Sequence, residues 1–261
     1  MYKKLIITII TTLALTLNVH ADSDGELLLK KNDPTEIKEC WEGFNRASFA
    51  LNQGLDKIIF RPVSSVYRSL PSPFKSGVSN SLNNLSNVVT IPNNLLQGEF
   101  AKAGENASRF VLNTTVGILG IFDVATYLGF SEYEKEDYGQ TLASHGVGPG
   151  CYLVLPVLGP KTARDTVAST INFLGGDAWY NITVKNETQH VSEFDYWASR
   201  ATSGVDFRAK NYDAIDNLQK NSLDFYASVK SVYLQDRQQK ILNSNQVIDS
   251  MNDSDWEEID N

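Results

Sequence analysis

The sequence predicts a mainly α-helical protein with one short hairpin-like segment, and two observations carry this prediction. Apolar side chains recur at every third or fourth position in five stretches between residues 40 and 242, which is the spacing of amphipathic helices. An apolar, partly β-branched run at Cys151–Leu155 instead follows three glycines at alternate positions, and Pro156 interrupts it. About five to eight helices with one hairpin define the mainly α class.

The first three stripes lie at residues 40–60, 74–89 and 100–119. Arg61-Pro62 is expected to end the first helix, because the residue before a proline avoids the helical region. The second stripe lies between the breakers Pro71–Pro73 and Ile91–Asn93, and polar Asn113–Thr115 in the third argue against a transmembrane span.

The next two stripes lie at residues 161–174 and 222–242, and Ser222 or Asp224 is available to cap the second of them. A helix rich in small and charged residues is expected between them, at residues 194–218. Amphipathic helices usually enclose a globular core, whereas helices on a membrane surface usually carry Lys/Arg-rich polar faces. Periodicity alone therefore leaves both a core and a lipid surface open as the destination of the apolar faces.

Residues 1–21 have the pattern of a secretory signal peptide. Lys3 and Lys4 precede the apolar residues 5–17, and Val19–Ala21 offers a small-residue cleavage site. This apolar stretch is shorter than the roughly 20 residues that a membrane span needs. We expect residues 22–35 to form a polar leader, residues 36–245 one helical domain, and residues 246–261 an acidic, disordered tail.

The chain is acidic, which excludes one class of partner. Its formal net charge is −8, and removal of the signal peptide with its two lysines makes it −10. A chain of this charge is repelled by nucleic acid, so nucleic-acid binding is excluded.

Two cysteines, Cys40 and Cys151, raise the question of a disulfide. Export permits the bond, which would stabilise the fold by about 4 to 5 kcal/mol; two unpaired buried thiols are the alternative. Both residues lie far from the expected cleavage site, so we expect a mature chain without an amino-terminal lipid anchor.

The glycine segment does not have the form of a phosphate-binding loop. Such loops follow a strand and open a helix, whereas Gly146, Gly148 and Gly150 precede a strand-like run. A flexible entry to a hairpin remains as the interpretation.

Short motifs in a single order resemble the MlaA/VacJ family over about residues 33–242. They are Glu42–Arg46, Phe60–Val63, Asn84-Leu85, Asn93–Gly98, Arg109–Gly117, Gly120–Ala125, Asp137–Leu142 and His145–Pro160, with Tyr226, Tyr233, Gln235 and Arg237 near the carboxyl end. Together they are far more specific than any one of them alone.

The resemblance implies a protein of Gram-negative bacteria that maintains the lipid asymmetry of the outer membrane. Family members are ring-like arrangements of amphipathic helices in the inner leaflet of that membrane, beside a trimeric porin. A polar channel removes mislocalised phospholipids from the outer leaflet and passes them to a periplasmic lipid carrier. The resemblance therefore implies phospholipids, the outer membrane, a porin and a carrier as partners, and a place on the periplasmic side of the outer membrane.

The resemblance and the residue types together suggest site residues. In the family the glycine-rich segment is mobile and lies beside the channel, so Gly146, Gly148 and Gly150 are hinge candidates. Guanidinium groups suit phosphate, which makes Arg46, Arg61 and Arg109 candidates for headgroup contact. Pairing of these arginines with Glu42, Asp56 or Glu105 is the favoured alternative. The aromatic residues Trp41, Trp179 and Trp197 suit either an interfacial or a core position.

Three departures from the family pattern stand out. The usual lipoprotein cysteine is missing, Lys230 stands where arginine is usual, and Thr35–Trp41 widens the spacing before Glu42.

We expect no enzyme activity, cofactor or metal. A hydrolase elbow of the Gly-x-Ser-x-Gly type is missing from the sequence, and the carboxylates of Glu132–Asp137 suit a solvated loop. The residues His145 and His190 lack the close spacing of metal ligands.

Two functions compete with a lipid channel. A soluble periplasmic lipid-binding carrier would have a closed apolar pocket and stay in the soluble fraction. A scaffold that only binds porins would leave the lipid distribution unchanged.

Overall fold

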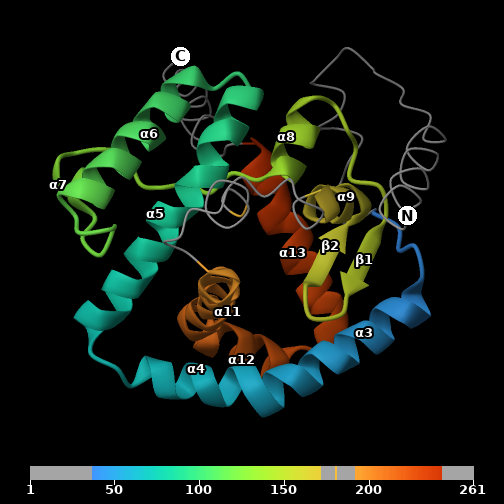
Figure 1. Cartoon of the computed structure of the whole chain (residues 1–261). Helices are drawn as coiled ribbons and strands as arrows, with labels where there is room; N and C mark the ends of the chain where they lie inside the picture. The colour runs from blue at the N-terminus through green and yellow to red at the C-terminus, as the bar shows by residue number, and fades with distance from the viewer. Residues whose placement is uncertain (1–36, 172–179, 181–191, 243–261) are drawn as a thin grey trace, which may run out of the picture. The chain divides into compact units, whose positions relative to one another are not determined.

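A computed structural model of the chain describes residues 37–171, 180 and 192–242 (Figure 1). The expected signal peptide, the leader and the acidic tail lie outside the described residues, as do Trp179 and His190. The elements in chain order are α3 (Glu42–Leu55), the π-helical turn η2 (Asp56–Phe60), α4 (Arg61–Arg68), α5 (Ser72–Leu96), α6 (Phe100–Thr115), α7 (Val124–Tyr127), α8 (Tyr138–Ser144), β1 (Tyr152–Leu155), β2 (Gly159–Thr162), α9 (Ala163–Ile171), α11 (Glu193–Lys210), α12 (Tyr212–Asn221) and α13 (Phe225–Leu242).

The mainly α class with a single hairpin is confirmed, although the described helices outnumber those expected. The short helices α7 and α8 are too brief to show an apolar period. The helix expected at residues 194–218 is divided at Asn211 into α11 and α12. The side-chain amide of Asn211 donates to the carbonyl of Phe207 at 2.9 Å, so this carbonyl in the last turn of α11 has a partner. The predicted cap of the last helix is present, because the carboxylate of Asp224 accepts the amide of Ala227.

Two prolines that were expected to end helices lie inside helical backbone instead. At Pro62 the chain widens into the turn η2, where the amide of Arg61 donates to the carbonyl of Asp56, five residues back. A π turn shifts the hydrogen-bond register, so the missing amide of Pro62 falls at the start of α4, where proline is tolerated. Within α5, Pro92 is followed by Asn93, whose side-chain amide donates to the carbonyl of Val89 at 2.7 Å.

The third predicted helix ends earlier than expected, at Thr115. The backbone of Ile118, Leu119 and Gly120 adopts positive φ angles of 52°, 55° and 83°, which the right-handed helix cannot accommodate.

The hairpin β1–β2 is antiparallel, with Tyr152 opposite Thr162, and α3 covers its outer edge. Two asparagines of α3, seven positions apart and so on the same face of the helix, form hydrogen bonds with this edge. Asn45 accepts from the amide of Val154 at 2.9 Å and donates to the carbonyl of Tyr152 at 3.2 Å. Asn52 makes the same pair of bonds with Val157 and Leu155. The helix therefore satisfies a strand edge that would otherwise be unpaired.

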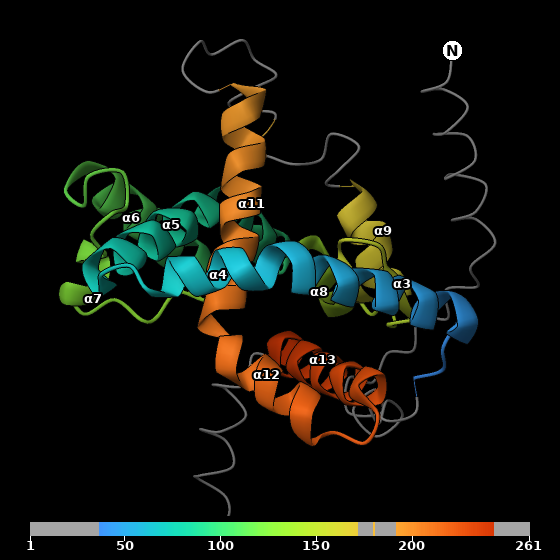
Figure 2. The same cartoon turned by 90° about the horizontal axis from the view of Figure 1, so that it is seen from below.

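The contacts between elements close a circuit (Figure 1). The described elements touch in the order α3, η2, α4, α11, α5, α8, α9, β2, β1 and back to α3. Helix α13 touches α8 and β2, and α12 touches α13. Figure 2 shows α11 running across the direction of α4, with α12 and α13 together on one side.

A buried ion-pair cluster joins three of these elements. Arg237 of α13 donates to both oxygens of Asp165 in α9, at 2.9 Å each, and to both oxygens of Asp137 at the start of α8, at 2.7 and 2.8 Å. Tyr233 donates to Asp165 at 2.7 Å. Burial favours the neutral acid, but these contacts and nearby Arg164 outweigh it and lower the pKa of Asp165 to about 2.

Cys40 and Cys151 are joined in a disulfide, with 5.3 Å between their Cα atoms and a sequence separation of 111. The disulfide connects the chain before α3 to the start of β1. The amide of Cys40 donates to the carbonyl of Tyr152 next to this bond.

Replacing both cysteines by alanine is expected to lower the free energy of unfolding by about 4 to 5 kcal/mol, because the bond closes a long loop in the unfolded chain. Denaturant unfolding of the oxidised wild type and of the double variant measures the difference. Reductant should bring the wild type to the level of the double variant and leave that variant unchanged. Equal stability of the oxidised wild type and the variant would contradict the expectation.

The free energy of unfolding is expected to fall as the pH drops from about 4 to about 2. An unfolded aspartate has a pKa of about 3.9, so the lowered pKa of Asp165 stabilises the fold above that value, and the stabilisation is lost as the pH falls through the folded value. The loss amounts to ~2 kcal/mol.

Denaturant unfolding at a series of pH values checks this. Asp165→Asn should be less stable at pH 7 and show a flatter decline, whereas Asp213→Asn, at an exposed ion pair, should keep the decline. An unchanged decline in Asp165→Asn would mean that other groups cause it.

Candidate functional site

Large apolar side chains are exposed along the continuous segment formed by α3, η2 and α4. Ile58 is 75% exposed and Val66 is 68% exposed, although both belong to helices with strong apolar stripes. A second exposed set follows α6 and the turn after it. We call these two sets the apolar belt: Trp41, Phe44, Leu51, Ile58, Ile59, Val63, Val66, Leu70 and Phe74 in the first, and Val111, Val116, Ile118, Leu119, Ile121 and Phe122 in the second.

The interior is correspondingly polar. The buried polar and charged residues include Asn45, Ser64, Asn84, Asn87, Thr90, Asn93, Asn94, Asn106, Arg109, Asn113, Glu136, Gln140, Asp165, Arg208 and Arg237. Among the described residues, the buried apolar side chains are four alanines, Leu153, Tyr196 and one cluster of Tyr152, Val154, Tyr226 and Leu234. The distribution is the reverse of an ordinary globular core.

Helix α5 illustrates this inversion. It packs on α6 through amides and hydroxyls: Asn84 donates to Thr114 at 2.9 Å, and Asn106 donates to Asn94 at 2.9 Å. It also contacts α8, where the hydroxyl of Thr141 donates to the side chain of Asn93 at 2.6 Å. The apolar face of α5, by contrast, remains half-exposed at Leu82 and Leu85.

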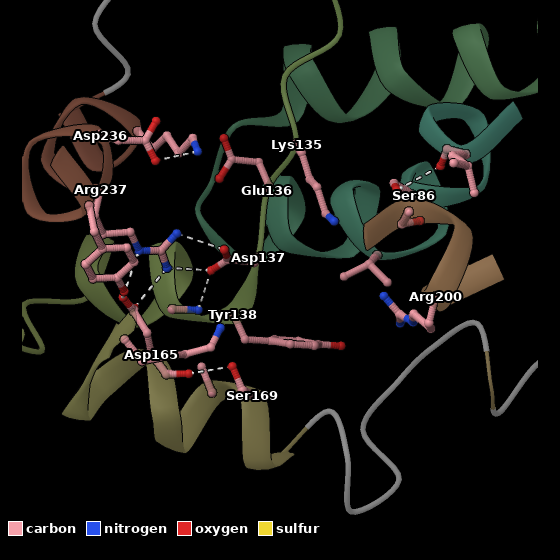
Figure 3. Close-up of a pocket in the computed structure, with 18 of the residues that line it drawn as sticks. Ser86, Lys135, Glu136, Asp137, Tyr138, Asp165, Ser169, Arg200, Asp236 and Arg237 are labelled. Carbon is pink, nitrogen blue, oxygen red and sulfur yellow. Dashed lines mark hydrogen bonds and ion pairs between the residues drawn. The ribbon is translucent and has the colours of Figure 1, made fainter. Parts of the chain in front are cut away.

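A polar cavity of about 300 Å³ lies among α5, α8, α9, α11 and α13 (Figure 3). Its charged lining residues are Lys135, Glu136, Asp137, Lys161, Asp165, Arg200, Asp236, Arg237 and Lys240. Arg237 is held by its two aspartates, and Lys240 pairs with Asp236 at 2.7 Å. Figure 3 shows Lys135 and Arg200 pointing toward the same part of the cavity.

Two lysines of the lining lack such partners. Among the described residues, the ammonium groups of Lys135 and Lys161 make no hydrogen bond or ion pair, although both lie near Asp137. Desolvation lowers the pKa of both ammonium groups, and neighbouring cations lower it further. Burial raises the pKa of the nearby Glu136 carboxyl, which reduces the negative charge available to these lysines. An anionic group in the cavity would give these two ammonium groups a partner.

The expected solvated loop at Glu132–Asp137 is wrong for its last two residues. Glu136 is buried and accepts from Gln140 at 2.6 Å and from Gln97 at 2.9 Å, and Asp137 caps α8 and binds Arg237. The run enters the interior only at these two residues, whereas Glu132, Glu134 and Lys135 are exposed. Lys135 was missed as a site residue, although its position as the lone base in this acidic run was a usable signal.

All three candidate arginines have ion-pair partners. Arg46 binds Glu42 and Asp224 at the surface, and Arg61 binds Asp216 at 2.6 Å. The third, Arg109, is buried and binds Asp123, Thr126 and the carbonyl of Ser131. Of the three acidic partners expected from the sequence, only Glu42 pairs with one of these arginines. The other two bind elsewhere: Asp56 pairs with Arg208, and Glu105 accepts from the amide of Ser131. None of the three arginines lines the cavity described above.

The three hinge candidates differ in conformation. Gly146 has a φ of 82° and ends α8, because its amide donates to Ala143 while that of Val147 donates to Leu142. At Gly150, a Cβ atom would meet that of Ala163 at 2.8 Å. Gly148 has open space around it and no positive φ. None of them is among the residues that line the cavity.

Ser144 and His145 are closer than neighbouring side chains usually are. The Ser144 hydroxyl lies 3.3 Å from Nδ1 of His145, but both groups also contact the carbonyl of Thr141, at 2.8 Å. They thus satisfy the end of α8. Over the described ranges, no group of three or more His, Cys, Asp or Glu residues could hold a metal ion.

Within the described part of the chain, the helices are all too short or too polar to cross a membrane. Trp41 and Trp197 are both more than half exposed, in agreement with an interfacial rather than a core position.

Comparisons with known proteins agree with these features. The family described as MlaA lipoprotein matches residues 37–240. An uncharacterized protein of Rickettsia bellii is 35% identical over 212 residues, which is 80% of this chain and 79% of the relative. The intermembrane phospholipid transport system lipoprotein MlaA of Escherichia coli K12 and that of Shigella flexneri are each 32% identical, over 85% of this chain and 84% of the relative.

A solved structure reported as the structural basis for maintenance of bacterial outer membrane lipid asymmetry has the same fold. It aligns with a TM-score of 0.65 and 31% identity, over 78% of this chain and 99% of that chain. The family match and these relatives together show that the chain belongs to the MlaA lipoprotein family.

Proposed function

We propose that this protein acts in intermembrane phospholipid transport and removes mislocalised phospholipids from the outer leaflet of the outer membrane. The observation that supports it is the inversion of the fold, with the apolar belt outside and the charged cavity inside. The relatives named for intermembrane phospholipid transport support the same process.

The physical reason is the cost of moving a headgroup through hydrocarbon. An unpaired polar or charged group costs several kcal/mol or more to bury in an apolar medium. A polar passage lowers that barrier and needs no covalent chemistry, in keeping with the proposal that the protein is not an enzyme. We propose that the apolar belt lies in the inner leaflet of the outer membrane, on the periplasmic side. By resemblance, a trimeric porin and a periplasmic lipid carrier are its partners.

The alternative of a soluble carrier receives less support. A carrier would hold acyl chains in a closed pocket, whereas the cavity among α5, α8, α9, α11 and α13 is lined by charged residues. The exposed apolar belt would also be a liability for a protein free in the periplasm.

Loss of this protein is expected to raise the phospholipid exposed on the cell surface, and expression of residues 1–261 should lower it again. Fractionation should place the protein with the outer membrane. Ile58→Glu with Val66→Glu should weaken both effects because the belt would lose apolar contact. The matched pair Leu223→Glu with Val232→Glu, exposed but outside the belt, should leave both intact. Unchanged surface phospholipid after loss, with a soluble protein, would favour the carrier.

The second expectation concerns the proposed hinge, and Gly148→Ala tests it most cleanly. Alanine at Gly148 meets neither strain nor a close neighbour, so it restricts the backbone without an expected loss of stability. Removal of outer-leaflet phospholipid should slow, while the unfolding midpoint and the membrane fraction stay unchanged.

Gly54→Ala is the matched control, because this glycine also has open space but lies within α3. Gly146→Ala is less informative, since its positive φ adds about 1 kcal/mol of backbone strain. Equal lipid removal by the wild type and by Gly148→Ala would eliminate a hinge at this position.

A further inference from the structure

An apolar groove of about 510 Å³ runs between α5 and α11, and its lining overlaps that of the charged cavity. Leu82, Leu85 and Ser199 line both. The rest of the groove is lined by Pro73, Phe74, Gly77, Val78, Ser81, Ile121 and Thr202. An apolar surface is therefore continuous with a charged one along a single helix.

Small residues leave room for the groove. Ser199 and Thr202 face α5 from α11, and the hydroxyl of Thr202 donates to the carbonyl of Ala198 in its own helix at 2.8 Å. On the opposite wall, a Cβ atom at Gly77 would lie 3.1 Å from the side chain of Ile121. Polar groups of the walls are thus either small or satisfied locally, which leaves an apolar lining.

The groove has the length of one acyl chain. The stretch from Phe74 to Leu85 rises roughly 16 Å along α5 at 1.5 Å per residue. One leaflet is about half of the ~30 Å hydrocarbon core, so its acyl chains extend about 15 Å. The outer end of the groove meets Phe74 and Ile121, which belong to the apolar belt.

We propose that the groove and the cavity form one phospholipid site, in which an acyl chain lies along α5 between Phe74 and Leu85 while the phosphate contacts Lys135 and Lys161. The site rests on the proposed function and names the lipid position within it. Charge complementarity selects the occupant, because the two lysines have no partner among the described residues and an anion would supply one. A headgroup with its own ammonium would add positive charge there, so net-negative phospholipids bind more tightly.

The experiment uses the mature protein in phosphatidylglycerol vesicles that contain a trace of phosphatidylglycerol with a photoreactive group midway along one acyl chain. Labelled residues, mapped by peptide mass spectrometry, should concentrate in Phe74–Leu85 and around Thr202. Phosphatidylethanolamine vesicles with the matching probe should give weaker labelling. Glycerol 3-phosphate, which lacks acyl chains, should not displace the probe.

Filling the groove is expected to reduce labelling there on the order of tenfold, about 1.4 kcal/mol. Thr202→Phe fills the groove from α11, and Ser81→Phe fills it from α5. If one of the two variants does not fold, the other still tests the site. Ser76→Phe is the matched control, because Ser76 is exposed on α5 and does not line the groove.

Removing the two cations tests the other end of the site. Lys135→Gln with Lys161→Gln should weaken labelling about tenfold, since a hydrogen bond to a charged group is worth about 1.5 kcal/mol or more. Lys220→Gln, at an exposed lysine of α12, should leave it unchanged.

Labelling spread over the apolar belt, or labelling in the groove that neither phenylalanine variant reduces, would overturn the site. The proposed function would survive either result if the same proteins still lower surface phospholipid in cells. Groove labelling without any effect on surface phospholipid would instead support the site and overturn the proposed function.

Discussion

The structure depends on hydrogen bonds between polar side chains that are buried between helices. In an ordinary helical protein, apolar faces meet and the order of elements follows from their burial. Here the apolar faces of α3, α4 and α6 point outward, so amides, hydroxyls and ion pairs must hold neighbours together. Hydrogen bonds are directional, and a buried partner left unsatisfied costs about 1 to 3 kcal/mol. The cavity walls are therefore fixed in position by many small, geometrically exact contacts rather than by an adaptable apolar core.

Rigid attachments surround the one segment that is rich in glycine. On its carboxyl side, the Cys40–Cys151 disulfide and the paired bonds of Asn45 hold β1 against α3. Arg164 also donates to the carbonyl of Val147 at 3.2 Å. On the amino side, α8 is fixed by Asp137 and Arg237. The amide of Arg164 also donates to the carbonyl of Pro149 at 3.1 Å. The proposed hinge at Gly148 would therefore move between fixed attachments.

Features that depend on residues close together in the sequence could be predicted, and features that depend on contacts between distant residues could not. Apolar periodicity is a local property, so the mainly α class, the helical stripes and the hairpin could be predicted. The passage through Pro62 could not, because a π turn depends on tertiary contacts such as that between Asp56 and Arg208. The same holds for the interior position of Glu136, whose partners come from α5 and α8. The lysines of the cavity are separated by 26 positions in the sequence, and only the fold brings Lys135 and Lys161 to one site.

The inverted fold also explains how a passage for phospholipids could work without an energy source of its own. A phospholipid combines a charged headgroup with chains that must stay in apolar surroundings. A purely polar tube would lower the free-energy cost of moving the headgroup but would expose the acyl chains to polar surroundings, which is also unfavourable. Along α5 the two requirements are met side by side, since the helix borders the charged cavity at Leu82 and Leu85 and the apolar belt at Phe74. A headgroup moving through the proposed site would keep polar contacts while its chain remains against apolar side chains. In the proposed site the barrier would depend on the local charge of the cavity, to which Lys135 and Lys161 contribute together with the other charged lining residues.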